Sequence, residues 1–507
     1  MNLADLLARA GVETCGGQDH AEIRVTEVMD DSRAVGPGMC FVAVRGATVD
    51  GHDFVEDAAR AGACAVIVDR DVKIGLGIPV VRVKDSRVAL AKLAAAFFGL
   101  RDERPNAASI DEPMKLIGVT GTNGKTTVTW LLRSILKAAG RPTALMGTVE
   151  YDLIDRREPA PLTTPGALEL AGRLATARVA GAKFAVLELS SHALDQRRCD
   201  GLTLAAGVFT NISGDHLDYH GSMEAYVAAK RRLFDGLDAS AFAIVNLDDS
   251  RCESVVAHSA AQRVTYAIES GSADVRGEIV SANSSGTTFT MIARSYKTTI
   301  RLGLVGRYNV ANALAAAATA EALGVDVESI QAGLEAVTGV PGRLERVEPP
   351  GYAFSVLVDY AHTDDALRNV LASVRPLTKR RLICVFGCGG DRDRSKRPRM
   401  AAAAASADVA LVTSDNPRGE DPQAIIDDIL PGFAGADSCE IIVEVDRRRA
   451  IQEAIALADD GDTVLIAGKG HETYQLVGDQ VLPFDDAAVA RECLRDRAAA
   501  PLAEGAV

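Results

Sequence analysis

The sequence lacks a long apolar run. No stretch of about eighteen consecutive apolar residues occurs, which a membrane-spanning helix requires. The first residues, MNLADLLARAGVETCGG, include the acidic Asp5 and no basic segment ahead of an apolar stretch, so they do not have the pattern of a secretory signal peptide. From these two absences we expect a soluble, cytoplasmic protein without membrane insertion.

Cysteine is sparse and irregularly spaced. The chain has nine cysteines, an odd number spread over 507 residues, and no C-x-x-C pair. This distribution gives poor support to a disulfide framework or a zinc site. We expect the closest pair, Cys384 and Cys388, to be reduced thiols that pack as small apolar side chains.

Positive charge is also in short supply. The 55 Lys and Arg residues against 69 Asp and Glu give a net charge of −14. A broad nucleic-acid-binding surface is disfavoured, because it needs clusters of Lys and Arg, although a local basic site remains compatible with this balance. The composition, 48% hydrophobic and 24% charged, is that of a globular protein, and the length predicts three or four domains at roughly 150 residues each.

Short β-rich apolar runs alternate with longer Ala/Leu-rich stretches through most of the chain. This alternation predicts βα units and mainly parallel sheets. The pattern divides into three blocks: residues 1–112, which end in a polar, linker-like stretch; residues 113–343, which open with a strand at 115–119; and residues 344–507, which open with a strand at 355–358. We therefore predict three α/β domains with these limits.

Polar, glycine-rich clusters follow the apolar strands of the second and third blocks. KLIGVT runs into GTNGKTT and FAVLEL into SSHALDQRR, and in the third block LICVF runs into GCGGDRDRSKRP and VLIAG into KGHETYQ. Open parallel sheets bind ligands at the carboxyl ends of their strands. Two such sheet edges facing one cleft would suit an enzyme that joins two substrates.

The strongest local pattern is GTNGKTT, residues 121–127, which lies after a strand and before an amphipathic helix. Glycines let backbone N–H groups approach phosphate oxygens, Lys125 can reach the terminal phosphates, and Thr126 can hold Mg²⁺. The strict phosphate-loop pattern would require glycine at position 119, where this chain has valine, so the pattern is a variant. It predicts nucleotide binding.

GTNGKTT resembles the ATP loop of the Mur ligases, and other clusters follow in that family's order: LELSSHALDQRR (187–198), DHLDYH (215–220), NVAN (309–312), VPGR (340–343) and DYAHT (359–363). The resemblance covers nearly the whole chain. It implies a three-domain fold with a smaller N-terminal α/β domain, a central P-loop ATPase-like domain with a mainly parallel sheet and a Rossmann-like C-terminal domain. It also implies an ATP-dependent amide-bond ligase of peptidoglycan precursor synthesis, which we expect to be a monomer.

The resemblance further implies which residues bind ATP and metal. The ATP-binding set is Gly121, Thr122, Asn123, Gly124, Lys125, Thr126, Thr127, Asn309, Asn312 and Arg343. Two Mg²⁺ ions are expected at Thr126, Glu188, His216 and Lys230, the last as N6-carboxylysine, a carbamate. Lys125, Lys230 and His216 are the expected catalytic residues. Without the resemblance, Glu188 and His216 would be read as solvated strand-end residues and Lys230 as a surface lysine.

Residues for a UDP-linked substrate follow from the same resemblance. The first block would hold uracil and ribose, and the second block the sugar and dipeptide of UDP-N-acetylmuramoyl-L-alanyl-D-glutamate. The expected residues are Asp30, Ser32, Ala47, Thr48 and Val49 in the first block, and Thr163, Thr164, Ser190, Gln196 and Arg198 in the second. The Asp-Ser-Arg cluster at 31–33 is also a common turn composition, so the first set has an ordinary structural alternative.

The third block resembles members of the family that add meso-diaminopimelate. The implied residues are Arg392, Asp415, Asn416, Pro417, Arg418, Gly468 and Glu472. Arg418 can hold the distal carboxylate bidentately, and Glu472 can pair with the distal ammonium. The alternatives are the same scaffold adding L-lysine, a folylpolyglutamate-synthetase-like ligase, and a nucleotide-dependent binding module without ligase activity.

Overall fold

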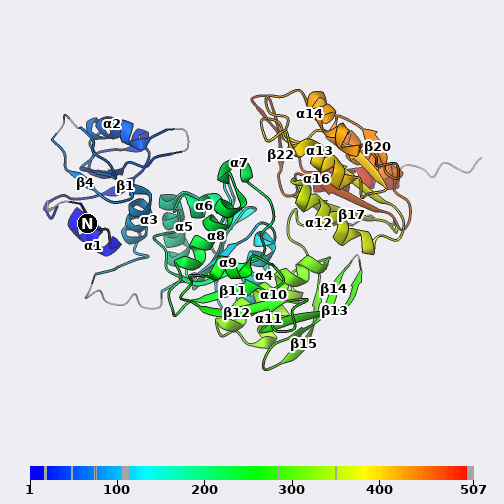
Figure 1. The fold of residues 1–507 in the computed structure, drawn as a ribbon, viewed down its shortest axis with the longest axis horizontal. Helices are drawn as coiled ribbons and strands as arrows, with labels where there is room; N and C mark the ends of the chain where they lie inside the picture. Colours follow the sequence, from blue (N-terminus) through cyan, green and yellow to red (C-terminus); the bar gives the residue numbers. More distant parts are fainter. Residues whose placement is uncertain are drawn as a thin grey trace, which may run out of the picture.

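The computed structural model describes residues 1–15, 20–46, 49–73, 75, 77–104, 113–283, 285–348 and 351–499. Ala47 and Thr48, two of the expected uridine-binding residues, lie outside this set. The chain forms three lobes, each built on its own sheet (Figure 1). Within the described residues, no helix has the length and apolar character needed to cross a membrane.

The N-terminal lobe is a parallel four-stranded sheet with helices on both faces. In spatial order its strands are β1 (Glu27–Met29), β2 (Met39–Val42), β3 (Ala65–Val68) and β4 (Val80–Arg82). Successive side chains alternate between the two faces. Val42 packs with α1 (Leu3–Ala10) and α3 (Ser86–Phe97), whereas Phe41 packs with α2 (Val55–Arg60).

The central lobe contains an eleven-stranded sheet in the order β15-β14-β13-β12-β11-β10-β5-β9-β6-β7-β8. Pairing is parallel from β13 to β6 and antiparallel at both edges. The strands are β5 (Lys115–Thr120), β6 (Thr143–Met146), β7 (Glu150–Asp152), β8 (Arg157–Pro159), β9 (Phe184–Glu188), β10 (Leu204–Phe209), β11 (Phe242–Asn246), β12 (Gln262–Ala267), β13 (Val275–Asn283), β14 (Gly286–Ile292) and β15 (Lys297–Leu302).

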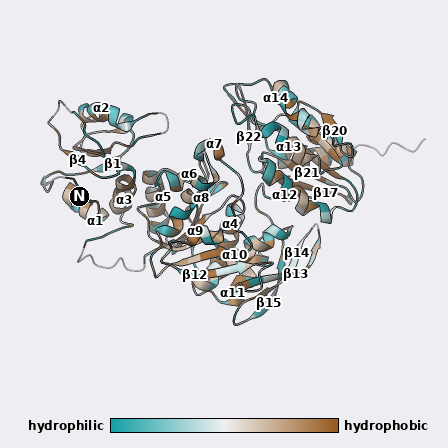
Figure 2. Cartoon of the chain, viewed as in Figure 1, coloured by the Kyte–Doolittle hydropathy of each residue, from teal (hydrophilic) through white to brown (hydrophobic). Residues whose placement is uncertain are grey.

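Helices cover both faces of the central sheet. On one face α4 (Lys125–Ala138), α10 (Arg307–Ala322) and α11 (Val327–Glu335) share a core with Ile117 and Val186. On the other face α5 (Ala167–Val179) and α8 (Met223–Asp235) share a core with Leu116 and Leu187. The short helices are α6 (Ser191–Asp195), α7 (Leu217–His220) and α9 (Cys252–Val256). Covering helices carry both teal and brown residues, as expected for elements with one buried side (Figure 2).

The C-terminal lobe is a doubly wound sheet in the order β16-β17-β21-β18-β19-β20, parallel except at β16. The strands are β16 (Glu345–Val347), β17 (Ser355–Asp359), β18 (Leu382–Phe386), β19 (Val409–Val412), β20 (Glu440–Val443) and β21 (Thr463–Ala467). One face is covered by α12 (Asp364–Val374), α13 (Lys396–Ala404) and α14 (Pro422–Ile429), the other by α15 (Arg447–Leu457) and α16 (Asp486–Ala499). A hairpin of β22 (Tyr474–Val477) and β23 (Gln480–Pro483) follows β21.

The predicted α/β class with mainly parallel sheets is confirmed. The three sheets lie within residues 27–82, 115–302 and 345–467. The domain limits at 112/113 and 343/344 stay a prediction, and residues 105–112 lie outside the described set. The nine cysteines are free thiols, with Cys384 buried and Cys388 partly buried.

Candidate active site

The phosphate-type loop connects β5 to α4 and is braced by residues from distant parts of the chain. Gly121 and Gly124 have φ of +148° and +90°, and a Cβ on them would lie 1.8 Å from the Thr210 hydroxyl oxygen and 2.3 Å from Asn312 Oδ1. The Thr210 hydroxyl donates to the Asn123 carbonyl at 2.6 Å. Glycine is therefore required here both by backbone conformation and by the close approach of these neighbours.

Two lysine ammonium groups converge on this loop. Lys125 Nζ donates to the carbonyl oxygens of Gly121 (3.0 Å) and Thr122 (2.8 Å). Lys230 Nζ, which is buried, donates to the same Gly121 carbonyl at 2.7 Å and lies 4.5 Å from the centre of the Tyr226 ring. Burial lowers the pKa of both lysines, and the charge of Lys125 lowers the pKa of Lys230 further. An anionic ligand at the loop would relieve this concentration of positive charge.

Glu188 stands at the end of β9 beside the loop, with 1% of its surface exposed. Its carboxylate accepts hydrogen bonds from the Thr126 hydroxyl (3.1 Å), the Thr148 backbone N–H (2.9 Å) and the Thr148 hydroxyl (2.8 Å). These oxygens are hard ligands of the kind that Mg²⁺ prefers. In the described part of the chain no group of three or more His, Cys, Asp or Glu side chains could hold a metal. A Mg²⁺ ion would therefore need phosphate oxygens and water to complete its coordination.

His216 occupies the N-cap position of α7 and lines the same cavity as the phosphate loop. Its φ is +54°, and 44% of its side chain is exposed. Its ring lies 4.8 Å from that of His192 in an edge-to-face arrangement. Partial burial lowers the pKa of His216 to about 4, and the positive charges of Lys125 and Lys230 act in the same direction. The ring is thus neutral at neutral pH, the form in which an imidazole binds metal.

Asn309 and Asn312 on α10 are buried and joined, since Asn312 Nδ2 donates to Asn309 Oδ1 at 3.1 Å. Asn312 Oδ1 in turn lies against Gly124. From the C-terminal side, Arg343 Nη2 donates to the Thr126 hydroxyl at 3.2 Å, and its guanidinium lies 4.8 Å from the centre of the Tyr360 ring. Most of the predicted ATP-binding residues are therefore brought together.

A cavity of about 870 Å³ opens beside this loop and is lined from both the central and the C-terminal lobes. The lining includes Lys125, Thr163 and Ser190 from the central lobe, and Tyr360 and His362 from the C-terminal lobe. Carboxyl ends of strands from two parallel sheets thus border one space, which is the arrangement for bringing two bound groups together.

The predicted UDP-substrate residues fall into two separate groups. Those of the central lobe gather near the end of β9: the hydroxyls of Thr163 and Thr148 are 3.1 Å apart, Arg198 donates to the Thr164 carbonyl at 2.6 Å, and Gln196 accepts from Arg198 at 2.8 Å. Ser190 caps the N-terminus of α6, its hydroxyl oxygen accepting from the backbone N–H of Ala193. The others, Asp30, Ser32 and the exposed Val49, lie on the N-terminal lobe and do not line the cavity.

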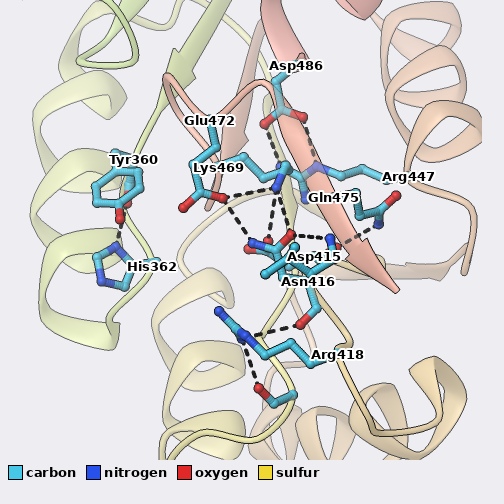
Figure 3. Close-up of polar contacts among 12 residues, drawn as sticks. Tyr360, His362, Asp415, Asn416, Arg418, Arg447, Lys469, Glu472, Gln475 and Asp486 are labelled. Carbon is cyan, nitrogen blue, oxygen red and sulfur yellow. Dashed lines mark hydrogen bonds and ion pairs between the residues drawn. The ribbon is translucent and has the colours of Figure 1, made fainter. Parts of the chain in front are cut away.

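The residues predicted to bind the amino acid follow β18, β19 and β21 (Figure 3). Arg418 has φ of +52°, and its Nη1 donates to the carbonyl oxygens of Gly390 (2.9 Å) and Asn416 (3.4 Å). Within the described ranges no carboxylate lies in salt-bridge distance of Arg418. Arg392 is exposed. Asn416 Nδ2 donates to Glu472 Oε2 at 2.9 Å, so these two predicted residues are in direct contact.

Pro417 and Gly468 shape the loops around these side chains. A Cβ on Gly390 would lie 1.9 Å from the Pro417 carbonyl oxygen, so the loops after β18 and β19 pack directly on each other. Gly468 has φ of +116°, and a Cβ there would lie 2.8 Å from Asp415 Oδ2. Glycine at 468 thus leaves room for the Asp415 carboxylate.

Sequence reasoning gave no role to several groups that the structure places at this site. Burial raises the pKa of Asp215, but the neighbouring His216, His362 and Lys396 lower it below its usual value, and Asp215 and His362 line the same cavity. Lys469 is wholly buried among the amino-acid-site residues. Its position between Gly468 and Gly470, in a strand-end loop that already held two predicted ligands, was the signal in the sequence.

Models of one protein family match most of the chain. The descriptions are "Mur ligase family, catalytic domain" for residues 24–98, "Mur ligase middle domain" for 119–320, and "Mur ligase, glutamate ligase domain" for 342–470. A Solibacter usitatus protein named UDP-N-acetylmuramoyl-L-alanyl-D-glutamate–2,6-diaminopimelate ligase is 44% identical over 498 residues, 98% of each chain. A Geobacillus thermodenitrificans protein of the same name is 45% identical over 474 residues, 92% of this chain and 94% of its own.

Solved structures agree with these relatives. One described as UDP-N-acetylmuramoyl-L-alanyl-D-glutamate–2,6-diaminopimelate ligase has a TM-score of 0.70 and 32% identity, covering 98% of this chain and all of that chain. The MurF ligase from Thermotoga maritima in complex with ADP has a TM-score of 0.58 at 20% identity, covering 94% of this chain and 96% of that chain. At that identity the second likeness shows the fold alone.

Proposed function

Since the chain belongs to the Mur ligase family, we propose that it couples ATP hydrolysis to the addition of meso-diaminopimelate to UDP-N-acetylmuramoyl-L-alanyl-D-glutamate. The new amide bond forms at the D-glutamate γ-carboxylate, as a cytoplasmic step of peptidoglycan precursor synthesis. The observation that supports diaminopimelate as the amino acid is the environment of Arg418. Its guanidinium has no carboxylate partner in the described chain and is held beside Asn416, which contacts Glu472.

The reaction proceeds in two steps. The D-glutamate γ-carboxylate attacks the γ-phosphorus of ATP, which releases ADP and leaves an acyl phosphate. The amine of diaminopimelate then attacks the acyl carbon, and inorganic phosphate departs as the amide forms. Lys125 and Arg343 supply positive charge at the phosphate loop, and the sheet edges hold the two reactants in line across the cavity.

Two Mg²⁺ ions, bound together with phosphate oxygens and water, would neutralise the charge that develops on the transferred phosphoryl group. Glu188 and Thr126 supply hard oxygen ligands, and His216 a neutral imidazole. Lys230 as an ammonium cannot bind a cation, but a carbamate on its nitrogen would turn it into an anionic oxygen ligand. Its burial beside Lys125 supports that modification, because an uncharged amine is the form that reacts with CO₂.

The N-terminal lobe is proposed to hold the uridine end of the nucleotide substrate, with Asp30, Ser32 and residues 47–49 as contacts. Thr163, Thr164, Ser190, Gln196 and Arg198 would continue this site toward the loop, and their hydroxyl, amide and guanidinium groups suit pyrophosphate and carboxylate oxygens. Residues 1–112, 113–343 and 344–507 are then the uridine, ATP and amino-acid domains of a monomer.

Lysine addition is disfavoured by the same amino-acid site, and a folylpolyglutamate-synthetase-like activity by the uridine-type residues of the first block. Lysine has no distal carboxylate, so it would leave the Arg418 guanidinium unpaired on binding, which costs affinity. A nucleotide-dependent module without ligase activity would leave the amino-acid site across the cavity without a role.

The test is a coupled assay of phosphate release from ATP by the purified full-length chain. We expect release only when both the UDP-dipeptide and meso-diaminopimelate are present, with a new UDP-tripeptide of the corresponding mass. Omitting either substrate, and replacing diaminopimelate by L-lysine or by glutamate, are the controls. Phosphate release that needs neither co-substrate, or equal use of lysine, would remove the proposal.

A further inference from the structure

Lys469 is a fully buried lysine, with 0% of its side chain exposed, in the turn after β21. Its Nζ donates to Asn416 Oδ1 and to Glu472 Oε2, both at 3.1 Å, and lies 3.6 Å from Asp415 Oδ1 (Figure 3). A buried ammonium is costly unless it is paired and hydrogen-bonded, and here both hydrogen-bond acceptors and the neighbouring Asp415 carboxylate belong to the predicted amino-acid site. The lysine is therefore built into that site.

The charges around Lys469 do not balance. Arg447 and Asp486, both wholly buried, form a bidentate ion pair at 2.8 and 2.6 Å, in which the two charges offset each other. Lys469 is then the cation that remains for two carboxylates, those of Asp415 and Glu472. Counting Asp415, Glu472 and Asp486 against Arg447 and Lys469, one negative charge is not compensated. We assign it to Glu472, because 17% of the Glu472 side chain is exposed against 8% for Asp415. A ligand ammonium would compensate it.

Lys469 also sets the orientation of the Asn416 amide. Asn416 Oδ1 accepts from both Lys469 Nζ and the Leu476 backbone N–H (3.0 Å), so the amide NH₂ must face Glu472, to which it donates at 2.9 Å. A flipped amide would place its NH₂ against the ammonium and the backbone donor. Both contacts to Glu472 use Oε2, and its other oxygen points away from Lys469 (Figure 3).

The same contacts reach Arg418. Its Nη1 donates to the Asn416 carbonyl, and its backbone N–H donates to the Leu476 carbonyl at 3.0 Å. Fixing Asn416 therefore fixes the spacing between the Arg418 guanidinium and the Glu472 carboxylate. A ligand with an ammonium and a carboxylate on one carbon would need that spacing, because its carboxylate would pair with Arg418 and its ammonium with Glu472.

We propose that Lys469 is a positioning residue that selects a zwitterionic amino-acid end by holding Asn416 and Glu472 in place and leaving one carboxylate charge unmatched. It does this from inside the protein, without touching the substrate. The inference rests on the proposed function, because it takes the group recognised to be the distal end of diaminopimelate.

The test compares Lys469→Met, which keeps the length and removes the charge, with Lys297→Met, a matched change at an exposed lysine on β15. We expect Lys469→Met to raise the KM for diaminopimelate about tenfold or more while the KM values for ATP and the UDP-dipeptide stay within about twofold. Lys297→Met should leave all three unchanged. Equal rises in all three KM values, or an unchanged KM for diaminopimelate, would overturn the proposal.

A double-mutant cycle tests whether Lys469 acts through Glu472. In a Glu472→Gln background, Lys469→Met should add little to the loss of diaminopimelate efficiency, because its target carboxylate is already gone. Additive effects would overturn the proposal. If Lys469→Met alone does not fold, Lys469→Met combined with Asp415→Asn removes one charge of each sign and is compared with Asp415→Asn alone. The double variant should show a further selective rise in the KM for diaminopimelate, and no further rise would overturn the proposal.

Failure of the proposed function is distinguishable from failure of this inference. If the unmodified chain and Lys297→Met form product with another amino acid instead of diaminopimelate, the proposed function is wrong. The same comparison made with that amino acid still decides the role of Lys469. A selective KM rise supports it as a positioning residue, and no change contradicts it.

Discussion

Two buried lysine side chains lie close together at the phosphate loop. Lys125 and Lys230 donate to one carbonyl oxygen, that of Gly121, and burial lowers the pKa of each. A lowered pKa enlarges the neutral fraction of a lysine at a given pH. Neutral Lys230 can add CO₂, and the carbamate so formed is destroyed as the pH falls.

At the residue scale we therefore predict that Lys230→Ala lowers kcat by at least about 100-fold, since even outer-shell residues of metal sites contribute about 10–100-fold. Removing CO₂ from the protein with its own sequence should reduce activity. Bicarbonate should restore the activity, more completely at higher pH. Intact mass should show the added CO₂ in the chain without a substitution and not in Lys230→Ala. Lys115→Ala, at the exposed start of β5, is the control. A bare ammonium in a crystal of the active protein, handled without acid, would contradict the carbamate.

Arg418 gives the residue-scale test of substrate choice. Truncation removes a charge-assisted contact worth about 2–5 kcal/mol, so Arg418→Ala should lose about thirtyfold or more in kcat/KM for diaminopimelate. Use of lysine should change little or improve slightly, because no unpaired guanidinium remains. The KM for ATP should not change, since Arg418 hydrogen-bonds to the strand-end loops and to β22 of the C-terminal lobe, away from the phosphate loop.

The measurement is steady-state kinetics with both amino acids. The exposed Arg392 is also predicted to contact the amino acid, and its guanidinium donates to the neighbouring Asp391 carbonyl at 3.2 Å, so Arg392→Ala provides a comparison variant. Equal losses for diaminopimelate and lysine in Arg418→Ala would make Arg418 a structural residue of its loop, and the choice of diaminopimelate would lose its main physical support.

At the scale of elements, the strand, loop and helix around the phosphate loop could be predicted from the sequence because their signals are local. The expected strand at 115–119 is β5 (Lys115–Thr120), and the expected helix after the loop is α4. The mainly parallel pairing also followed from the alternation of strands and helices. The antiparallel extension β13–β15 was not anticipated, because periodicity within a strand does not reveal its partner.

Contacts between elements that are remote in sequence could not be predicted from local sequence patterns. Gly124 must be glycine partly because Asn312 lies against it, although α10 begins far along the chain. Lys469 pairs with Asn416 across 53 positions, and nothing local to either residue indicates that pairing. Such contacts exist only once β19 and β21 end at the same edge of the sheet, which is why resemblance named Asn416 and Glu472 but left Lys469 without a role.

At the scale of the whole molecule, the central and C-terminal lobes meet at a turn around Gly342. Its φ is +64°, its carbonyl accepts from the Tyr360 backbone N–H at 2.9 Å, and a Cβ there would lie 2.1 Å from the His471 backbone nitrogen. On one side the next residue, Arg343, reaches Thr126 of the phosphate loop. On the other, the 468–472 turn carries Lys469 and Glu472. The turn thus joins the two halves of the site.

Gly342→Ala should therefore damage ligation without unfolding either lobe. The added methyl group must push the 468–472 turn away or shift Arg343 off Thr126, and the positive φ adds strain of about 1–3 kcal/mol. We expect kcat/KM to fall about tenfold or more for ATP and for diaminopimelate together, because one displacement separates the two binding edges. Gly339→Ala is the matched control, since a Cβ there would meet nothing within 4 Å. Thermal unfolding and steady-state kinetics decide the outcome: if Gly342→Ala turns over as fast as Gly339→Ala, the close packing of this turn does not set the distance between the two sheet edges.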